Sequence, residues 1–324
     1  MLPVPFDSKN PKPEPVALVV APLSDQALKP LAPHFVLVRW AQLSDSQAWL
    51  QQHAHRVQVV ITNGVTGLPA GCAEALQSLR LIACNGVGYD AIDLEWARQR
   101  GIAVSNTPDV LSADVADLAL SLLLAVYRQI PQADRFVRQG AWARGPFPLG
   151  RRLSGSRVGI LGLGQIGKRI ASRCLAFDTE VAYTGRQPQA DVAYPYFSSP
   201  LALAQWADVL IAATPGGVAT RHLVNGPVLD ALGSQGVFIN IARGSVVDEA
   251  ALIERLATGR LAAAGLDVFN QEPFVPDTLR ALPNTVLSPH IASATVQTRQ
   301  AMAELLVRNV VALVQGQSLP SRVC

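Results

Sequence analysis

The chain has 324 residues, with 27 Lys and Arg against 24 Asp and Glu, and a formal net charge of +3. A charge this small for the length gives no reason to expect binding to nucleic acid or to an anionic membrane surface. Hydrophobic residues make up 49% of the chain and charged residues 16%, which is typical of a globular protein. The length is sufficient for two domains, each with its own core.

Residues 1–15 are rich in proline and lack the apolar stretch of a signal peptide, so we expect a flexible tail. The most apolar segment, 115–126, contains Asp117 and is shorter than a bilayer span, which predicts a core helix. His53 and His55 have a spacing that could chelate a metal, but a solvated helix end is the preferred interpretation. The cysteines show no metal-binding spacing and predict free thiols in a reducing compartment: Cys72, Cys84, Cys174 and Cys324. We therefore expect a cytoplasmic protein without a metal site.

Short apolar runs recur through the first hundred residues, each typical of a parallel strand that is buried on both faces. Helical patterns separate most of them, including 46–52 and 94–100. Strands that alternate with helices predict β-α units around a parallel sheet. The predicted strands of this first unit are 16–21, 35–38, 57–62, 81–84 and 102–105.

A second unit of the same kind follows a long apolar helix over 114–127 and a Gly- and Pro-rich loop over 140–150. The chain is predicted to end in a long amphipathic helix over 296–315. The predicted strands of the second unit are 158–161, 181–184, 209–213, 237–241, 263–267 and 285–288, with helices at 201–207, 228–232 and 249–257.

A G-x-G-x-x-G motif lies between the strand at 158–161 and an amphipathic helix that continues from Lys168. Its first glycine permits a tight turn, its second lets the backbone approach a pyrophosphate, and its third lets the helix pack close to the strand. The phosphates then lie at a helix N-terminus, which favours anions. Such a motif is weak alone, but the strand before it and the helix after it predict a dinucleotide site. Its expected contact residues are Gly162, Leu163, Gly164, Gln165, Ile166 and Gly167.

Three short segments late in the second unit each follow a predicted strand: 241–245, 270–273 and 288–293. Ligands of open α/β sheets bind beyond the carboxyl ends of the strands, so Arg243, Glu272 and His290 could face one site. Taken singly, each residue has an ordinary explanation, as part of a turn, an element end or a helix cap. Their joint order after a dinucleotide motif favours a functional site.

At these residues the chain resembles the D-isomer-specific 2-hydroxyacid dehydrogenases, particularly their glyoxylate/hydroxypyruvate reductase branch. The resemblance implies a catalytic site made of Arg243, Glu272 and His290. Before about residue 80 the similarity lies mainly in the strand pattern. The motifs that carry the resemblance lie at 85–90, 106–109, 162–167, 243–244, 265–269, 271–273 and 288–290.

The chemistry of 2-keto acid reduction suits these side chains. Hydride delivery to the carbonyl carbon leaves an alkoxide, and the imidazolium of His290 can give it a proton near neutral pH. A hydrogen-bonded Glu272 favours the charged imidazole and fixes its orientation. Arg243 can hold the substrate carboxylate with its planar fork and polarise the carbonyl.

The resemblance implies further contacts with substrate and cofactor. The backbone N–H groups of Val87 and Gly88 would bind the substrate carboxylate, because glycine permits a concave amide nest, although an ordinary turn is the alternative. Asp267 would hold the nicotinamide carboxamide. The segment 214–217 reads TPGG where relatives often have Pro-Leu-Thr, which leaves local cofactor contacts open. The other expected cofactor contacts are Thr214, Thr220 and Ile241.

Assembly is also implied by the resemblance. The helix over 112–128 resembles the dimerisation element of the family, so we expect a homodimer. Trp142 matches a position whose indole reaches the substrate pocket of the other subunit, and packing within its own subunit is the alternative.

The expected cofactor is NADP(H), with NAD(H) possible. NAD enzymes place an acidic residue about 20 residues after the glycines to bind the ribose 2′-OH. Here the strand over 181–184 runs into Gly185 and Arg186, with no acid at that place. We expect Arg186 to pair with a 2′-phosphate instead, although a solvated surface arginine is the alternative.

We therefore expect an α/β enzyme with two doubly wound parallel-sheet domains. A Rossmann dinucleotide domain, 105–287, is inserted into a flavodoxin-like substrate domain made of 1–104 and 288–324, with the active site in the cleft and hinge closure on binding. The predicted function is NADPH-dependent reduction of glyoxylate and hydroxypyruvate to D-2-hydroxy acids. Alternatives are the reduction of hydroxyphenylpyruvate or 2-ketogluconate, phosphoglycerate, formate or phosphonate dehydrogenation, and a non-enzymatic NAD(P)-sensing protein.

Overall fold

The computed structural model describes residues 14–324, so residues 1–13 of the predicted tail lie outside the described part. The described chain divides into two compact units, which we treat separately. Unit 1 comprises residues 14–108 and Arg299–Cys324, and unit 2 comprises Asp109–Thr298. The junctions follow Pro108 and Thr298, compared with residues 104 and 287 in the prediction from sequence.

Unit 1 is built on a five-stranded parallel sheet in the order β2-β1-β3-β4-β5, which is the flavodoxin-like order. The side chains of β1, β4 and most of β3 are buried, as expected of strands covered on both faces. The strands are β1 (Val16–Val19), β2 (Val36–Arg39), β3 (Val57–Thr62), β4 (Leu81–Cys84) and β5 (Ala103–Ser105).

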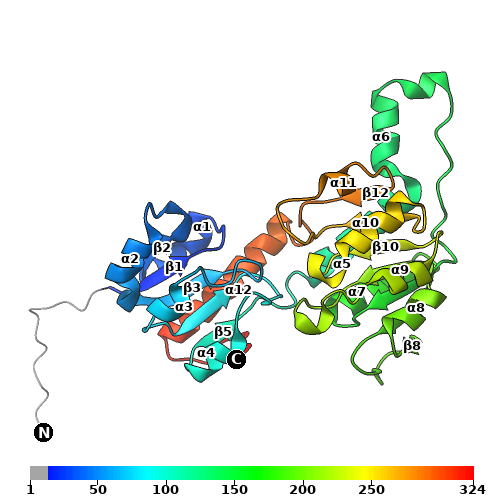
Figure 1. Cartoon of the computed structure of the whole chain (residues 1–324). Coiled ribbons are helices and arrows are strands. Elements are labelled where there is room, and N and C mark those ends of the chain that lie inside the picture. Colours follow the sequence, from blue (N-terminus) through cyan, green and yellow to red (C-terminus); the bar gives the residue numbers. More distant parts are fainter. Residues whose placement is uncertain (1–13) are drawn as a thin grey trace, which may run out of the picture. The chain divides into compact units, whose positions relative to one another are not determined.

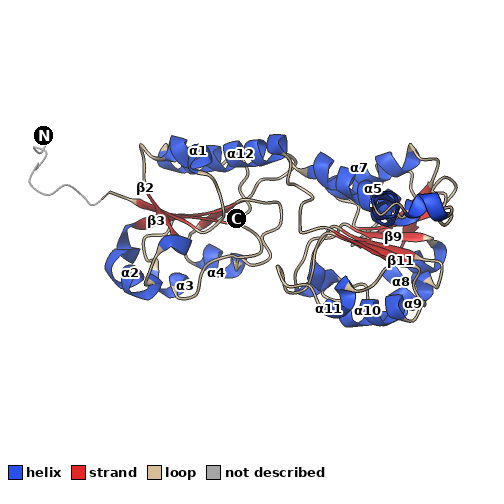
Figure 2. Cartoon of the chain, turned by 90° about the horizontal axis from the view of Figure 1, so that it is seen from above, coloured by secondary structure: helices blue, strands red, loops and turns tan. Residues whose placement is uncertain are grey.

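Helices cover both faces of this sheet, with α1 and α12 on one face and α2, α3 and α4 on the other (Figure 2). Local capping explains where two of them begin, because Asp45 accepts the Ala48 N–H at 2.9 Å and Asp93 accepts the Trp96 N–H at 2.9 Å. The helices are α1 (Asp25–Leu28), α2 (Ser46–His53), α3 (Cys72–Ala75), α4 (Leu94–Gln99) and α12 (Val296–Val314), whose first residues belong to unit 2.

Unit 2 contains a seven-stranded parallel sheet in the order β12-β11-β10-β9-β6-β7-β8. Strand order reverses beside β6, which is the arrangement of dinucleotide-binding sheets and confirms the predicted Rossmann domain. The short edge strand β8 was not predicted from the sequence. The strands are β6 (Arg157–Leu161), β7 (Glu180–Thr184), β8 (Tyr196–Phe197), β9 (Val209–Ala212), β10 (Val237–Asn240), β11 (Ala263–Leu266) and β12 (Thr285–Leu287).

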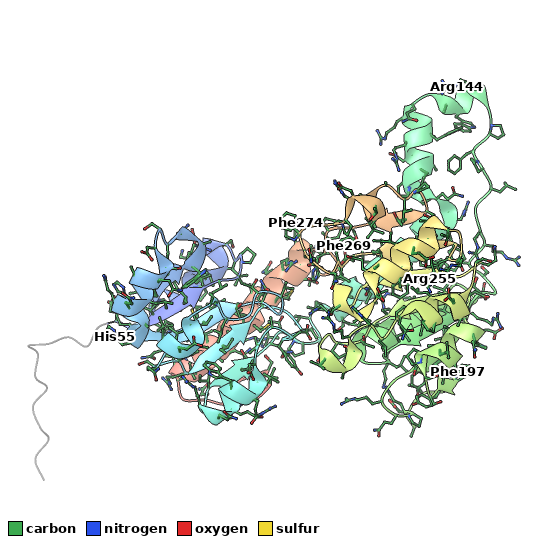
Figure 3. The ribbon with its side chains drawn as sticks, viewed as in Figure 1. His55, Arg144, Phe197, Arg255, Phe269 and Phe274 are labelled. Atoms are coloured by element: carbon green, nitrogen blue, oxygen red, sulfur yellow. The ribbon has the colours of Figure 1, made fainter. Side chains whose placement is uncertain are left out.

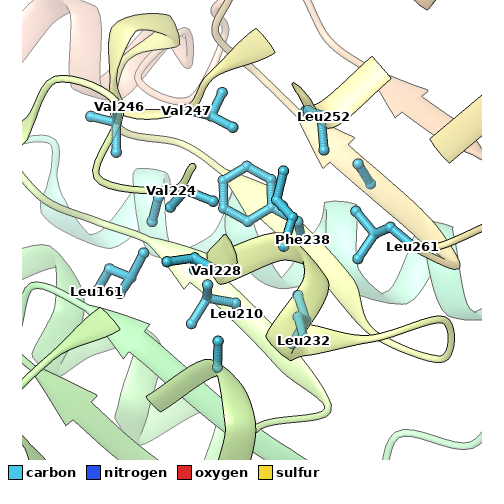
Figure 4. Packing of buried hydrophobic residues seen from close by; sticks show 14 of the residues in the cluster. Leu161, Leu210, Val224, Val228, Leu232, Phe238, Val246, Val247, Leu252 and Leu261 are labelled. Carbon is cyan, nitrogen blue, oxygen red and sulfur yellow. The ribbon is translucent and has the colours of Figure 1, made fainter. Parts of the chain in front are cut away.

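The helices of unit 2 also form two layers, with α5 and α7 on one face of the sheet and α8 to α11 on the other (Figure 2). The second layer covers a hydrophobic core around Phe238, which is fully buried (Figure 4). The helices are α5 (Ser112–Arg128), α6 (Ile130–Arg138), α7 (Gln165–Leu175), α8 (Pro200–Trp206), α9 (Gly226–Leu232), α10 (Glu249–Ala257) and α11 (Asp277–Arg280). Short 3-10 turns lie at Lys29–Leu31, Trp40–Gln42, Ala54–Arg56, Ala141–Arg144, Val218–Thr220 and Gly244–Val246.

Residues 129–150, which we call the arm, extend away from the body of unit 2 (Figure 1). The arm starts at Gln129, whose φ of 53° turns the chain out of α5 and into α6. None of its residues is buried. The 140–150 loop predicted from sequence therefore belongs to a longer projection, which begins with a helix and includes the turn Ala141–Arg144.

Over 14–324 no helix is long and apolar enough to cross a membrane. Within the same range, no cluster of three or more His, Cys, Asp or Glu residues is arranged to hold a metal ion. The ring of His53 stacks on the ring of Trp49, and the Nδ1 atom of His53 lies 3.0 Å from the Trp49 carbonyl oxygen. Among the described residues, Cys72, Cys84, Cys174 and Cys324 form no disulfide bond.

Candidate active site

The three segments singled out in the sequence all emerge from carboxyl ends of neighbouring strands. Arg243 follows β10, Glu272 follows β11 and His290 follows β12, and these strands lie side by side in the parallel sheet. Ligand sites of open α/β sheets form at this edge. The fold thus places the side chains at the edge where chemistry is expected.

The glycine-rich turn between β6 and α7 has the geometry its sequence predicts. Gly162 has a φ of +94°, in the region that favours glycine, and a Cβ on Gly167 would lie 2.1 Å from the Gly162 carbonyl oxygen. A Cβ on Gly164 would meet nothing within 4 Å. The turn is therefore tight, the helix packs closely against it, and the middle glycine leaves open space. These features fit a dinucleotide pyrophosphate at the N-terminus of α7.

Glu272 and His290 form a direct pair. The Nδ1 atom of His290 lies 2.6 Å from Oε2 of Glu272, and the other carboxylate oxygen, Oε1, accepts the Phe269 N–H at 3.0 Å. The segment from Phe269 to Phe274, labelled in Figure 3, turns back on itself because the Phe274 N–H donates to the Gln271 carbonyl. Glu272 therefore approaches His290 from a compact turn.

The electrostatics of Glu272 favour its ionised form. Burial alone would raise its pKa, but the hydrogen bond and charge of His290, the Phe269 N–H and the charge of Arg243 together lower the pKa below its usual range. Glu272 is thus an anion at neutral pH, next to an imidazole that it can stabilise as a cation. The effect of Arg243 on the same carboxylate brings all three predicted residues into one electrostatic site.

The backbone of His290 is held by Asp267, at the end of β11. His290 has a φ of 52°, an uncommon conformation for a residue with a side chain. Its N–H donates to the Asp267 carbonyl oxygen at 2.8 Å. The carboxylate of Asp267 accepts hydrogen bonds from Ser288 Oγ at 2.6 Å and from the Ile291 and Ala292 N–H groups at 2.9 Å each. Asp267 therefore fixes the loop on both sides of the imidazole.

Asp267 itself is fully buried, and burial raises its pKa, although the three donors and the charge of His290 act in the opposite direction. The contact of Asp267 with the nicotinamide carboxamide stays a prediction. The structure adds an internal role, because both carboxylate oxygens serve the 288–292 loop.

Arg243 is positioned by a neighbour that the sequence analysis missed. Asn240, the last residue of β10, is completely buried and accepts the Ala242 N–H at 3.0 Å while donating to the Arg243 carbonyl at 3.0 Å. The guanidinium Nη1 donates to the Ala242 carbonyl at 2.7 Å. The available signal was an amide-bearing residue at the end of an otherwise apolar strand.

The remaining predicted cofactor residues lie near the carboxyl ends of β7, β9 and β10. Arg186 is exposed two residues after β7. Thr214 follows β9, and its buried hydroxyl has no hydrogen-bond partner within the described part of the chain. The Thr220 hydroxyl donates to the Pro215 carbonyl at 2.8 Å. Ile241 is buried directly after β10. Their contacts with a cofactor stay predictions.

Val87 and Gly88 belong to unit 1, in the loop after β4. The Val87 carbonyl accepts a hydrogen bond from the Asn106 side chain at 2.9 Å, and the Thr107 N–H donates to the Gly86 carbonyl at 2.9 Å. The loop is therefore held from the segment that follows β5. Trp142 lies on the arm and is 68% exposed. The roles of Val87, Gly88 and Trp142 in substrate binding stay predictions.

Comparisons with known proteins agree with this fold. The model of the D-isomer specific 2-hydroxyacid dehydrogenase NAD-binding domain matches residues 120–292. A glyoxylate/hydroxypyruvate reductase A of Arabidopsis thaliana is 45% identical over 302 residues, covering 93% of this chain and 96% of the relative. A hydroxyphenylpyruvate reductase of Plectranthus scutellarioides is 43% identical over the same shares of both chains.

A solved structure gives the same result in three dimensions. It is an NADPH-dependent glyoxylate/hydroxypyruvate reductase of Sinorhizobium meliloti in complex with NADP and malonate. The match has a TM-score of 0.89 and 41% identity, and it covers 96% of this chain and 97% of the solved chain. The sequence motifs, the strand orders and these similarities lead to one conclusion: the chain belongs to the D-isomer specific 2-hydroxyacid dehydrogenase family.

Proposed function

We propose that this enzyme reduces small 2-keto acids, with glyoxylate and hydroxypyruvate as its preferred substrates, to D-2-hydroxy acids, and that NADPH is its preferred reductant. The observation that carries the proposal is the 2.6 Å pair of His290 and Glu272 beside Arg243, at the carboxyl ends of β10 to β12. The names of the similar reductases support the substrate class.

The roles of the side chains follow from their hydrogen bonds. When bound, the reduced nicotinamide supplies the hydride. His290 holds its proton-donating position because Glu272 occupies Nδ1, so Nε2 is the atom that can pass a proton to the nascent alkoxide. Arg243 binds the substrate carboxylate and polarises the carbonyl. The N–H groups of Val87 and Gly88 are proposed to bind the same carboxylate.

The preference for NADPH rests on Arg186, an exposed cation where an NAD enzyme would have an acid. The Arg186→Ala variant should weaken NADPH use by roughly 10–100-fold, the value of one or two charged hydrogen bonds, and should change NADH use little. A wild-type enzyme that prefers NADH would refute this part of the proposal.

A homodimer is the proposed assembly, with Trp142 reaching the substrate pocket of the other subunit. The exposed apolar side chains of the arm support it, because Leu149 is 96% exposed and Ile130, Val137 and Trp142 are also largely exposed. Sedimentation equilibrium measures the assembly directly. We also propose a cytoplasmic location, which the lack of a disulfide bond among the described cysteines supports.

The function is tested by steady-state kinetics with NADPH and NADH on glyoxylate, hydroxypyruvate, pyruvate, hydroxyphenylpyruvate and 2-ketogluconate, with chiral analysis of the products. We expect glyoxylate or hydroxypyruvate to give the highest kcat/KM and a D-product. An L-product or a clear lead for pyruvate would overturn the assignment. A lead for hydroxyphenylpyruvate or 2-ketogluconate would move it to those alternatives, and no turnover at all would favour an NAD(P)-sensing protein.

A further inference from the structure

The segment that follows Arg186 is fastened to the glycine-rich turn by side chains that the function described so far does not use. Gln189 Nε2 donates to the Leu163 carbonyl at 2.8 Å, and the Gln189 N–H donates to the Tyr183 hydroxyl at 2.7 Å. A few residues further on, the Lys168 ammonium forms an ion pair with Asp191 at 2.7 Å. These contacts hold the segment 186–191 against the start of α7.

The sheet register explains why the two loops meet. β6 and β7 pair in parallel with Leu161 opposite Thr184, and the Gly162 N–H donates to the Thr184 carbonyl at 2.9 Å. The glycine-rich turn and the segment containing Arg186 therefore start side by side at the same edge of the sheet. Lys168 is the first residue after Gly167, and its side chain reaches from α7 across to the neighbouring segment.

The ion pair of Lys168 with Asp191 is partly exposed, so another anion can replace the carboxylate. The two side chains are 38% and 69% exposed, and ion pairs of this exposure contribute little to stability. A phosphate monoester carries nearly two negative charges at neutral pH and three acceptor oxygens, so it competes well with one carboxylate for an ammonium group. The cations at this edge, Arg186 and Lys168, therefore suit a phosphate as ligand.

We propose that Lys168 is a second cation for the 2′-phosphate of NADP(H), and that Asp191 keeps the ammonium in place and is displaced from it when the phosphate binds. This inference rests on the proposed use of NADP(H). It adds a residue of α7 to a phosphate site that the sequence assigned to Arg186 alone. It also assigns a function to Asp191, whose carboxylate competes with the cofactor for the same ammonium.

The test compares two ligands that differ only in the phosphate of interest, 2′,5′-ADP and 5′-AMP. Their dissociation constants are measured by isothermal titration calorimetry on the full chain and its variants. Lys168→Gln should weaken 2′,5′-ADP binding by roughly 10-fold or more, as expected for a lost charge-assisted hydrogen bond, and leave 5′-AMP within about twofold. Asp191→Asn should tighten 2′,5′-ADP binding severalfold, because the competing charge is removed.

A matched control is Arg169→Gln, which removes an exposed cation next to Lys168 on the same helix and should alter neither ligand. Lys168→Arg should retain most of the affinity, which separates charge from misfolding. The wild type should bind 2′,5′-ADP more tightly than 5′-AMP. If this preference is lost in Arg186→Ala but unchanged in Lys168→Gln, the inference is overturned and the NADP(H) proposal stays intact. Equal weakening of both ligands by Lys168→Gln would also overturn it. Equal binding of both ligands by the wild type would refute the NADP(H) preference itself.

Discussion

The segment 266–292 and the arm belong to the same compact unit, yet their conformations are maintained differently. In 266–292 a fully buried Asp267 fixes the loop around His290, and Glu272 fixes the imidazole. In the arm no residue is buried, and Arg144 lies near its outer end (Figure 3). Its internal contacts are local, such as the Arg138–Asp134 ion pair and the edge contact of Phe136 with Phe147.

This difference suggests that the segment 266–292 serves the chemical step and that the arm serves assembly. The Glu272–His290 pair, the proposed proton carrier, is complete within one chain, because its supporting hydrogen bonds come from the segments that follow β11 and β12. The arm has apolar side chains without an internal core to cover them, so a second copy of the chain is the proposed cover. Variants in 266–292 should therefore act on kcat and pH dependence, and variants in the arm on selectivity and assembly.

The largest effect is expected from His290. The His290→Gln variant removes the proton donor and should lower kcat for keto-acid reduction by about 10²–10⁴-fold, while the dissociation constant of NADPH changes little. Stopped-flow and steady-state kinetics together measure both quantities. His55→Gln, in unit 1, is the matched histidine control. A loss below about tenfold would contradict the assignment of His290 as the donor.

The next largest effect is expected from Asp267. Asp267→Ala leaves the Ser288 hydroxyl and two N–H groups without their acceptor, so the free energy of unfolding should fall by about 1–3 kcal/mol. Because His290 loses its anchored loop, kcat should also fall by at least about tenfold. Asp267→Asn retains one acceptor oxygen, so its free energy of unfolding and its kcat should lie between those of the wild type and those of Asp267→Ala. Urea unfolding and kcat are the measurements, and a stable, fully active Ala variant would refute the anchoring role.

A smaller and different effect is expected from the arm. Trp142→Ala removes an exposed indole and should change the ratio of kcat/KM between hydroxypyruvate and a bulkier keto acid by severalfold, roughly the value of one lost apolar contact. The free energy of unfolding of the monomer should not change, because the exposed indole of Trp142 is not part of a hydrophobic core. Unchanged selectivity would remove Trp142 from the substrate pocket of the other subunit.

Helices and strands with local sequence patterns were predictable. The predicted strands 57–62 and 81–84 coincide with β3 and β4, and the predicted helix 249–257 coincides with α10, because continuous apolar runs and amphipathic spacing leave little choice. The short edge strand β8 and the helix α6 were missed. The apolar residues of α6, Ile130, Phe136 and Val137, have helical spacing, so a signal for this helix was present although it buries no residue.

The residues of the candidate site could be predicted from the sequence, but the hydrogen bonds that hold them in place could not. Arg243, Glu272 and His290 were located by motif and by their place after strands. The anchoring functions of Asn240 and Asp267 depend on which N–H groups the folded loops present, and that information is tertiary. The same holds for Lys168, whose partner Asp191 lies on a different segment of unit 2.

The central claim is that Glu272 holds His290 as the proton carrier, and the pH profiles of the two reaction directions test it most directly. Reduction needs a protonated imidazole and oxidation a neutral one, so the two rates should show opposite pH trends. The pKa of Glu272 lies below its usual range, so the carboxylate is charged across neutral pH and favours the imidazolium there. This support is lost only when acid protonates Glu272.

Glu272→Gln keeps a hydrogen-bond acceptor for Nδ1 but removes the charge. Both pH profiles should therefore move to lower pH. Glu249→Gln, which alters a carboxylate that accepts the Asn270 N–H nearby, is the matched control and should leave the profiles in place. This account predicts that the rates of reduction and oxidation have opposite pH trends and that both profiles shift together to lower pH in Glu272→Gln. Profiles that do not move in this variant would contradict it.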